Sequence, residues 1–437
     1  MTSSDSIFRR VMQGEVYPAI GCTEPISCAY AAAVAAKSLA GPVDRVHLRV
    51  DRATFKNGAA VAVPSSGNRK GNVIAAAMGA ALANPAEKLQ LLRDVTPAIL
   101  AQAVTLSVYC DYGVIEKATE FTVCVTVFAA EHSASCTLTG GHTRIERVEA
   151  DNEVVFQAAA DDSPDANGDY RHELRALPFM ELFQIADRLG DDDLATCRLG
   201  VDMNLAMAER GYDVRRTAWQ LRRMVETGLL VDDLFTHTKA TIASAVDARM
   251  AGLPEPVMTS GGSGNQGIVA ILTPWLVGTN RGIDPTRILR SIAAAHLVNA
   301  YIKCFVGELS VICGCAICAG IAAAVAIVYQ HCGCDSEKIN LAVGNVAGDL
   351  GGLICDGAKP GCAMKTVTSV EAAMRAAFMA MEGYGLSRDD GLVGDCPEQT
   401  VRNLGRVTLE GMFQVDPTVL RILQDKRRLE NDLCPET

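Results

Sequence analysis

This 437-residue sequence has fewer basic than acidic residues. Its 40 lysines and arginines stand against 51 aspartates and glutamates, which gives a formal net charge of −11. That balance disfavours nucleic acid and anionic membranes as partners. The first residues, MTSSDSIFRRVMQGEVYP, lack the basic start, apolar run and small-residue cleavage site of a secretory signal. We therefore expect a cytoplasmic protein that binds neither nucleic acid nor a membrane.

Long apolar runs are also scarce. Residues 309–330, LSVICGCAICAGIAAAVAIVYQ, are apolar for long enough to span a bilayer, but no second run of that quality exists. The run contains three cysteines and two glycines, and alanine-rich segments flank it. These features favour the buried central helix of an α-domain, and we expect that helix over residues 309–331.

The length and the 49% hydrophobic content suit two domains with sizeable cores. Alternating apolar and polar residues predict strands, and longer periods before and after them predict helices. An acidic stretch with proline and glycine, Ala160 to Arg171, is the best candidate for a linker. The expected fold is α+β. An N-terminal helix and a small, mainly antiparallel sheet occupy residues 1–160, with strands at 46–51, 105–112 and 120–129, and this domain packs on a larger all-α domain, residues 171–437.

Cysteine is abundant, and half of the 16 cysteines fall in about one seventh of the chain, at positions 304, 313, 315, 318, 332, 334, 355 and 362. In a reducing compartment such a surplus indicates metal binding or catalysis more than disulfides. A zinc site would more often show two Cys-x-x-Cys knuckles or added histidines, and only Cys315 to Cys318 has that spacing. The spacing leaves three interpretations open: an iron–sulfur cluster, a zinc site and plain core packing.

Helical geometry separates the candidates further. On the predicted helix, Cys313 and Cys315 point to nearly opposite sides, whereas Cys315 and Cys318 share a face. Cys355 and Cys362 bracket a loop, ICDGAKPGCAMK, whose glycines and proline let the backbone bring two thiols together. Its lysines would lower the pKa of those thiols and favour the form that binds metal.

A glycine-rich stretch, TSGGSGNQGI, precedes an apolar helix. Free backbone N–H groups at a helix N-terminus bind anions, and a substrate carboxylate is the natural guest. No Gly-Lys-Ser/Thr follows, so this is not a phosphate-binding P-loop, and a plain inter-helix loop remains the alternative. The residues expected to bind substrate are Ser260, Gly261, Gly262, Ser263, Gly264 and Asn265.

A third motif, GCTEP (residues 21–25), reads as a helix start, with Thr23 able to cap it and Glu24 in its first turn. Cys22 is then expected to be an exposed thiol at a helix N-terminus, where the thiolate is favoured. FKNGAAVAVP, from Phe55 to Pro64, is expected to be a turn leading into a strand.

Together, GCTEP, KNG, SGGSGNQG, ELS-x-x-CGC-x-x-x-AG and CDGAK-x-x-CAMK resemble the L-cysteine desulfidase family, which is itself similar to bacterial iron–sulfur L-serine dehydratases. The five motifs occur in the expected order between Gly21 and Lys365. Where that family leads us to expect a Pro-Gly-Thr-Gly turn, this chain has Pro64-Ser65-Ser66-Gly67, a departure that bears on the substrate pocket.

The resemblance implies a [4Fe–4S] cluster held by three cysteines, with one open iron and no pyridoxal phosphate. The matching ligands are Cys315, Cys355 and Cys362, with Cys22 as a rival third ligand or the catalytic thiol. The implied reaction is β-elimination from a small amino acid, L-cysteine first, giving pyruvate, ammonia and hydrogen sulfide.

Beta-elimination also needs a base at the α-carbon. Cys22, Lys303 and Lys359 are the candidates, and the sequence does not choose among them. Serine, threonine or another β-substituted amino acid is the alternative substrate, and a non-catalytic iron–sulfur sensor is the alternative function. A homodimer is the only protein assembly we expect.

Overall fold

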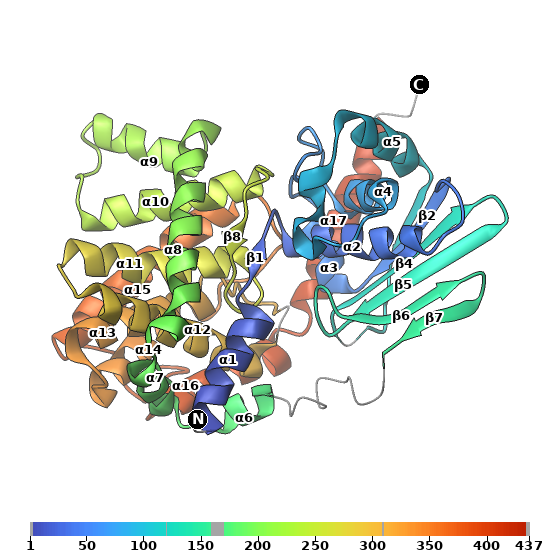
Figure 1. Ribbon diagram of the computed structural model, residues 1–437. Helices are drawn as coiled ribbons and strands as arrows, with labels where there is room; N and C mark the ends of the chain where they lie inside the picture. Colours follow the sequence, from blue (N-terminus) through green and yellow to red (C-terminus); the bar gives the residue numbers. More distant parts are fainter. Residues whose placement is uncertain (1–2, 119, 159–169, 308–309, 434–437) are drawn as a thin grey trace.

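The computed structural model describes residues 3–118, 120–158, 170–307 and 310–433. In Figure 1 the sheet and the helices that cover it lie on the right, and a larger body of helices lies on the left. This arrangement confirms the expected α+β fold class. Most of the predicted linker, Ala160 to Arg171, lies outside the described residues.

The first half of the chain forms a six-stranded sheet in the order β3-β2-β4-β5-β6-β7, and every neighbouring pair is antiparallel except β2 and β3, which are parallel. Burial alternates along β4 and β5, so one face of the sheet is apolar, and α2 packs against it together with α4. The elements are α1 (Ser3–Glu15), β1 (Pro18–Ala19), α2 (Thr23–Lys37), β2 (Arg45–Val50), α3 (Arg52–Gly58), α4 (Asn72–Leu82), η1 (Lys88–Asp94), α5 (Pro97–Val108), β3 (Cys110–Val114), β4 (Thr122–Ala129), β5 (His132–Thr139), β6 (Ile145–Ala150) and β7 (Glu153–Gln157).

The second half is helical apart from β8, which pairs with β1. Its core is built around α12 and α13, whose buried faces carry alanine, valine and isoleucine at close spacing. The elements are α6 (Tyr170–Ala176), α7 (Phe179–Arg188), α8 (Asp191–Gly211), η3 (Tyr212–Val214), α9 (Thr217–Glu226), α10 (Leu234–Met250), β8 (Val257–Met258), α11 (Gly264–Asn280), α12 (Pro285–Val306), α13 (Cys318–Cys332), α14 (Ser336–Leu350), α15 (Cys362–Met381), α16 (Pro397–Arg406), η4 (Val407–Gly411) and α17 (Val415–Leu433).

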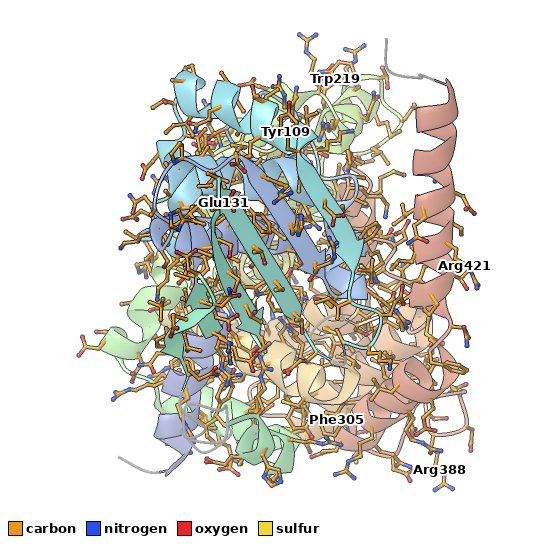
Figure 2. The ribbon with its side chains drawn as sticks, turned by 90° about the vertical axis from the view of Figure 1, so that its right-hand side faces the viewer. Tyr109, Glu131, Trp219, Phe305, Arg388 and Arg421 are labelled. Atoms are coloured by element: carbon orange, nitrogen blue, oxygen red, sulfur yellow. The ribbon has the colours of Figure 1, made fainter. Side chains whose placement is uncertain are left out.

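The first and the last helix, α1 and α17, each pack against the core of the other half of the chain. Phe8 and Val11 of α1 belong to the helical core, whereas Leu420 of α17 belongs to the core beneath the sheet. Figure 2 shows α17, with Arg421 on it, running along one side of the sheet. The division at residues 160 and 171 stays a prediction, and these two helices lie across it.

Two local predictions are wrong. Residues 105–108 continue α5 instead of opening a strand, and the Thr105 hydroxyl donates to the carbonyl of Ala101 one turn earlier. The KNG segment belongs to α3 instead of a turn, because the Asp51 carboxylate accepts the Thr54 N–H at 2.9 Å and caps a helix there.

No single helix in the described ranges is long and apolar enough to cross a membrane. The bent pair η1 and α5 passes that test of length and composition only when the two are taken together.

Candidate active site

A cavity of about 910 Å³ lies where the two halves meet. Its wall combines the GCTEP segment, η1 and the turn after β5 from the first half with the glycine-rich loop, the end of α12 and both cysteine loops from the second half. Segments far apart in the sequence thus face one space, as an active site between domains requires.

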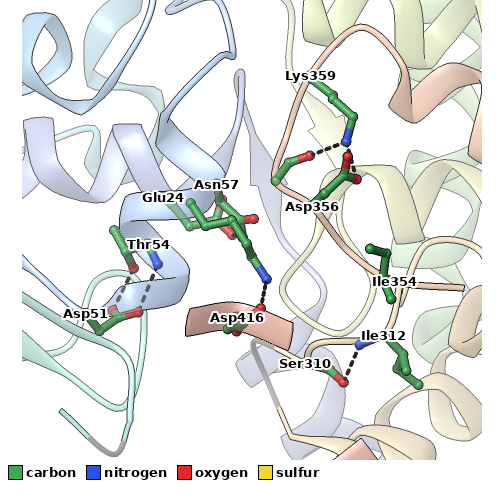
Figure 3. Close-up of polar contacts among 12 residues, drawn as sticks. Glu24, Asp51, Thr54, Asn57, Ser310, Ile312, Ile354, Asp356, Lys359 and Asp416 are labelled. Carbon is green, nitrogen blue, oxygen red and sulfur yellow. Dashed lines mark hydrogen bonds and ion pairs between the residues drawn. The ribbon is translucent and has the colours of Figure 1, made fainter. Parts of the chain in front are cut away.

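Two cysteine segments meet beside this cavity in a short antiparallel pairing. Ile312 and Ile354 form an isolated bridge, the Cys313 N–H donates to the Leu353 carbonyl at 2.8 Å, and the Cys355 N–H donates to the Val311 carbonyl at 2.7 Å. Figure 3 shows Ile312 and Ile354 side by side. The pairing fixes the loop of Cys313 and Cys315 against that of Cys355.

This pairing corrects the expected helix over 309–331. Residues 308–309 lie outside the described ranges, 310–317 are not helical, and α13 begins only at Cys318. The argument that helical geometry sets Cys313 and Cys315 on opposite sides is therefore wrong, because both thiols line the cavity. The glycine between the two cysteines was the available signal for a loop instead of a helix. Gly314 packs so closely on Gln266 that a Cβ at this position would come within 2.7 Å of the Gln266 side chain.

Six of the described cysteines line the cavity: Cys22, Cys313, Cys315, Cys318, Cys355 and Cys362. The predicted ligands are all among them. Cys332 and Cys334 are not, in agreement with the preference given to the loop cysteines.

Burial and the neighbouring lysines have opposite effects on the pKa values of these thiols. Burial raises the pKa of Cys355 and raises that of Cys362 to about 11. A hydrogen bond from Cys315 and the nearby Lys365 ammonium lower the pKa of Cys313 despite its burial. Lys56 of α3 counteracts the burial of Cys355. The thiols that gather here are thus mostly protonated, with cations beside them that favour thiolates once a metal competes for the sulfur.

The Cys355–Asp356 turn is held by two lysines. Burial alone would raise the pKa of Asp356, but hydrogen bonds from Lys359 and Lys365 lower it to about 2. Lys365 also donates to the Ile354 carbonyl at 2.8 Å. The described cavity wall includes Lys365 but not Lys359, whose ammonium binds Asp356 and the Gly357 carbonyl (Figure 3). Lys359 is therefore poorly placed to act as the base.

One face of α12 holds the glycine-rich loop. Asn299 donates to the Ser260 hydroxyl at 3.0 Å, and His296 lies at 3.0 Å from the same oxygen. Lys303, one turn further along, donates to the Gly261 carbonyl. Burial lowers the pKa of His296 to about 3, so it is neutral. These three residues position the loop, and Lys303 in addition reaches the cavity wall.

The predicted substrate-binding residues divide into two groups. Gly261, Gly262, Ser263 and Asn265 line the cavity, whereas Ser260 and Gly264 support them from behind. Gly261 and Gly262 have φ of +56° and +70°, where other residues are strained. At Gly264 a Cβ would lie 2.4 Å from Nε of Arg249. The loop thus bends so that the first turn of α11 opens toward the cavity.

GCTEP begins α2 as expected, but the N-cap is Cys22 instead of Thr23, no side chain caps the helix, and the Cys22 thiol is buried instead of exposed. Cys22 Sγ donates to Glu24 Oε2 at 2.9 Å, and Asn57 Nδ2 donates to Glu24 Oε1 at 2.7 Å. Burial and the Glu24 charge raise the pKa of Cys22. Burial would raise the pKa of Glu24 too, but His142 and these hydrogen bonds lower it. A neutral thiol therefore faces an ionised carboxylate.

Four helices begin at this cavity: α2 at Cys22, α11 at Ser263, α13 at Cys318 and α15 at Cys362. Each helix thus places the positive end of its dipole at the cavity wall. At α13 and α15 the first N–H groups are already paired with the preceding turns, as Ala319 is with the Gly314 carbonyl and Cys362 with that of Lys359. The helix ends therefore favour an anion in the cavity mainly through their dipoles.

Within the described parts of the chain, no group of three or more His, Cys, Asp or Glu residues is arranged to hold a metal ion. An iron–sulfur cluster binds each cysteine through a different iron, so its ligands stand farther apart than those of one ion. Cys315, Cys355 and Cys362 line one cavity and are close enough for their charges to interact, with lysines beside them, and this donor set fits a cluster.

Sequence reasoning gave no role to three residues of the wall, Arg249, Gln266 and Cys313, whereas Lys365 was among the lysines expected beside the loop thiols. Gln266 and Cys313 stand inside the motifs already quoted. Arg249 had no signal, because its helix reads as ordinary core until the fold brings its end to α11.

Residues 178–421 match the family described as serine dehydratase alpha chain. A UPF0597 protein of Geobacter sulfurreducens is 48% identical over 427 residues, covering 97% of this chain and 100% of the relative. Those of Elusimicrobium minutum and Desulfotalea psychrophila are 40% and 35% identical, covering 96% of this chain and 99% and 98% of their own lengths. The family match agrees with the dehydratase side of the resemblance. The chain belongs to the serine dehydratase alpha chain family and to the group of UPF0597 proteins.

Proposed function

We propose that this protein is an iron–sulfur-dependent lyase that removes the β-substituent of a small L-amino acid. The observation that carries the proposal is the gathering of Cys315, Cys355 and Cys362, from two loops and a helix start, on one cavity that also opens to the glycine-rich loop. The family supports a dehydratase-like lyase, and the quoted motifs favour L-cysteine as substrate.

Cys315, Cys355 and Cys362 would hold a [4Fe–4S] cluster, and Cys313 is the neighbouring thiol in the same loop pairing. When bound, the cluster supplies a Lewis acid that assists departure of the leaving group. Lys56 and Lys365 balance the charge of the thiolates. The Asp356 carboxylate fixes the turn through both of its lysines.

The α11 N-terminus and its loop bind the substrate carboxylate. For the α-proton, Cys22 is the best placed of the three candidate bases: Lys359 is absent from the described wall, and Lys303 is engaged with the Gly261 carbonyl. The neutral Cys22 thiol passes its proton to Glu24 in the same step in which its sulfur takes the α-proton of the substrate, so no free thiolate forms beforehand. Loss of the β-substituent gives an aminoacrylate, which tautomerises and hydrolyses to pyruvate and ammonia.

The experiment is a substrate panel on anaerobically purified protein. L-cysteine, L-serine and L-threonine are incubated separately, and sulfide, ammonia and 2-oxo acid are measured. Equimolar sulfide, ammonia and pyruvate from L-cysteine supports the proposal. Ammonia and 2-oxo acid from serine or threonine, without sulfide from cysteine, assigns the dehydratase alternative. A stable cluster with no turnover of any amino acid assigns the sensor.

A further inference from the structure

We infer that Arg249, at the C-terminal end of α10, binds the carboxylate of the substrate directly, so that the site is specific for free α-carboxylates. The inference rests on the proposed function, which it deepens by assigning a substrate-binding residue outside the glycine-rich loop. It also orients the substrate, with its carboxylate at α11 and its β-substituent toward the cysteines.

Burial and partners single out Arg249. Its side chain is only 2% exposed, yet it forms no ion pair with any described residue, and its Nε is buried without a hydrogen-bond partner. Nη1 donates to Asn265 Oδ1 at 2.9 Å. A buried guanidinium without a carboxylate costs several kcal/mol unless another anion satisfies it. A bound substrate would supply that anion.

Arg249 also lies where a carboxylate would be held. It lines the cavity together with Asn265 and Gln266 of the first turn of α11. Gly264 leaves room for the guanidinium, because a Cβ there would come within 2.7 Å of the Arg249 Cζ. The Arg249 charge also offsets part of the burial that raises the pKa of Cys22. The Arg249 guanidinium and the N-terminus of α11 thus both place positive charge beside Cys22, the candidate base.

Three other cations of the wall are already bound to carboxylates. Lys365 binds Asp356, and Arg10 and Arg171 bind the carboxylates of Glu173 and Glu15. A planar guanidinium binds a carboxylate through two parallel N–H···O bonds, which lysine cannot reproduce.

Two thiol probes separate the carboxylate from the rest of the substrate. 3-Mercaptopropionate has a thiol and a carboxylate but no amine, whereas cysteamine has a thiol and an amine but no carboxylate. Their dissociation constants are measured by anaerobic calorimetry on cluster-loaded wild type, Arg249→Gln and Arg249→Lys. Arg287→Gln is the matched control, because Arg287 is half-buried and donates to the Tyr329 and Gln330 carbonyls instead.

Arg249→Gln is expected to weaken 3-mercaptopropionate about 10-fold to 100-fold, the effect of losing a charge-assisted hydrogen bond, and to leave cysteamine unchanged. Arg249→Lys keeps the charge and is expected to weaken the same probe about 10-fold, so the test survives if the glutamine variant does not fold. Arg287→Gln should bind both probes like the wild type. Unchanged affinity for 3-mercaptopropionate, or equal loss of both probes, overturns the inference.

The substrate panel on the wild type separates this inference from the proposed function. Turnover by the wild type with unaltered probe binding in both Arg249 variants overturns only the role of Arg249. Probe binding that depends on Arg249, in a wild type that turns over no amino acid, overturns only the lyase and leaves a carboxylate-binding site.

Discussion

Cys355 and Cys396 are thiols with opposite surroundings, one on the cavity and the other exposed at the start of α16. We expect Cys355→Ser to lose most of its iron after anaerobic purification, because serine is a poor substitute for a thiolate ligand. Cys396→Ser is the control and should keep wild-type iron content. Iron and acid-labile sulfide are measured on both. Equal iron content in the two variants would mean that Cys355 holds no cluster.

Glu24 accepts the hydrogen bond of the Cys22 thiol, and glutamine keeps its shape while removing its charge. Glu24→Gln is expected to lower kcat by about 100-fold, the typical contribution of a positioned proton acceptor, with KM changed only a few-fold. Glu87→Gln, at an exposed residue of the cavity rim, should leave both constants unchanged. Steady-state kinetics decide the matter, and a Glu24→Gln variant as fast as the wild type would remove Glu24 from the mechanism.

At the scale of elements, α17 is fastened to α3 by one ion pair. Lys56 Nζ lies 2.6 Å from Asp416 Oδ1, with side chains 1% and 15% exposed. Asp416→Asn leaves a buried ammonium without its carboxylate, so we expect the free energy of unfolding to fall by roughly 3 kcal/mol. Glu410→Gln breaks the exposed pair with Arg406 and should change it by less than about 0.5 kcal/mol. Urea unfolding compares them, and equal effects would show that the α17 contact is not stabilising.

Asp247 of α10 accepts the Ala218 N–H at 2.9 Å at the start of α9, and burial raises its pKa from 3.8 to about 6. The folded state holds this proton more tightly than the unfolded state does, so stability falls as pH rises from about 4 to 6 and stays lower above that. A shift of this size corresponds to about 2–3 kcal/mol. Asp247→Asn should lack this fall, whereas the exposed-site variant Asp389→Asn should keep it. Unfolding free energies between pH 4 and 7 test this, and identical pH profiles for wild type and Asp247→Asn would contradict it.

Local patterns predicted much at this scale. The alternation in residues 120–129 predicted β4, and GCTEP predicted the start of α2. The cysteine loop was missed because its conformation is set by pairing with residues 353–355, some forty positions away. The burial of Cys22 was missed for the same reason, since the covering segments come from the other half of the chain.

At the scale of the whole molecule, the cavity exists only because two cores meet. The sequence predicted two halves and a cluster in the second, which both stay predictions, and it did not predict that α1 and α17 each pack on the opposite half. Arg249 shows the same limit: its helix is an ordinary buried helix by pattern, and its position beside Asn265 follows only from the fold. Motifs thus identify reactive side chains, while their partners depend on tertiary packing.

The central claim is that elimination depends on a cluster bound at this cavity. The direct measurement is the rate of sulfide release from L-cysteine as a function of cluster content, in samples of one preparation reconstituted anaerobically with increasing iron and sulfide. The rate is expected to rise in proportion to cluster content, up to one [4Fe–4S] cluster per chain, and to vanish in the metal-free protein. A colourless, metal-free protein that remains fully active would contradict it.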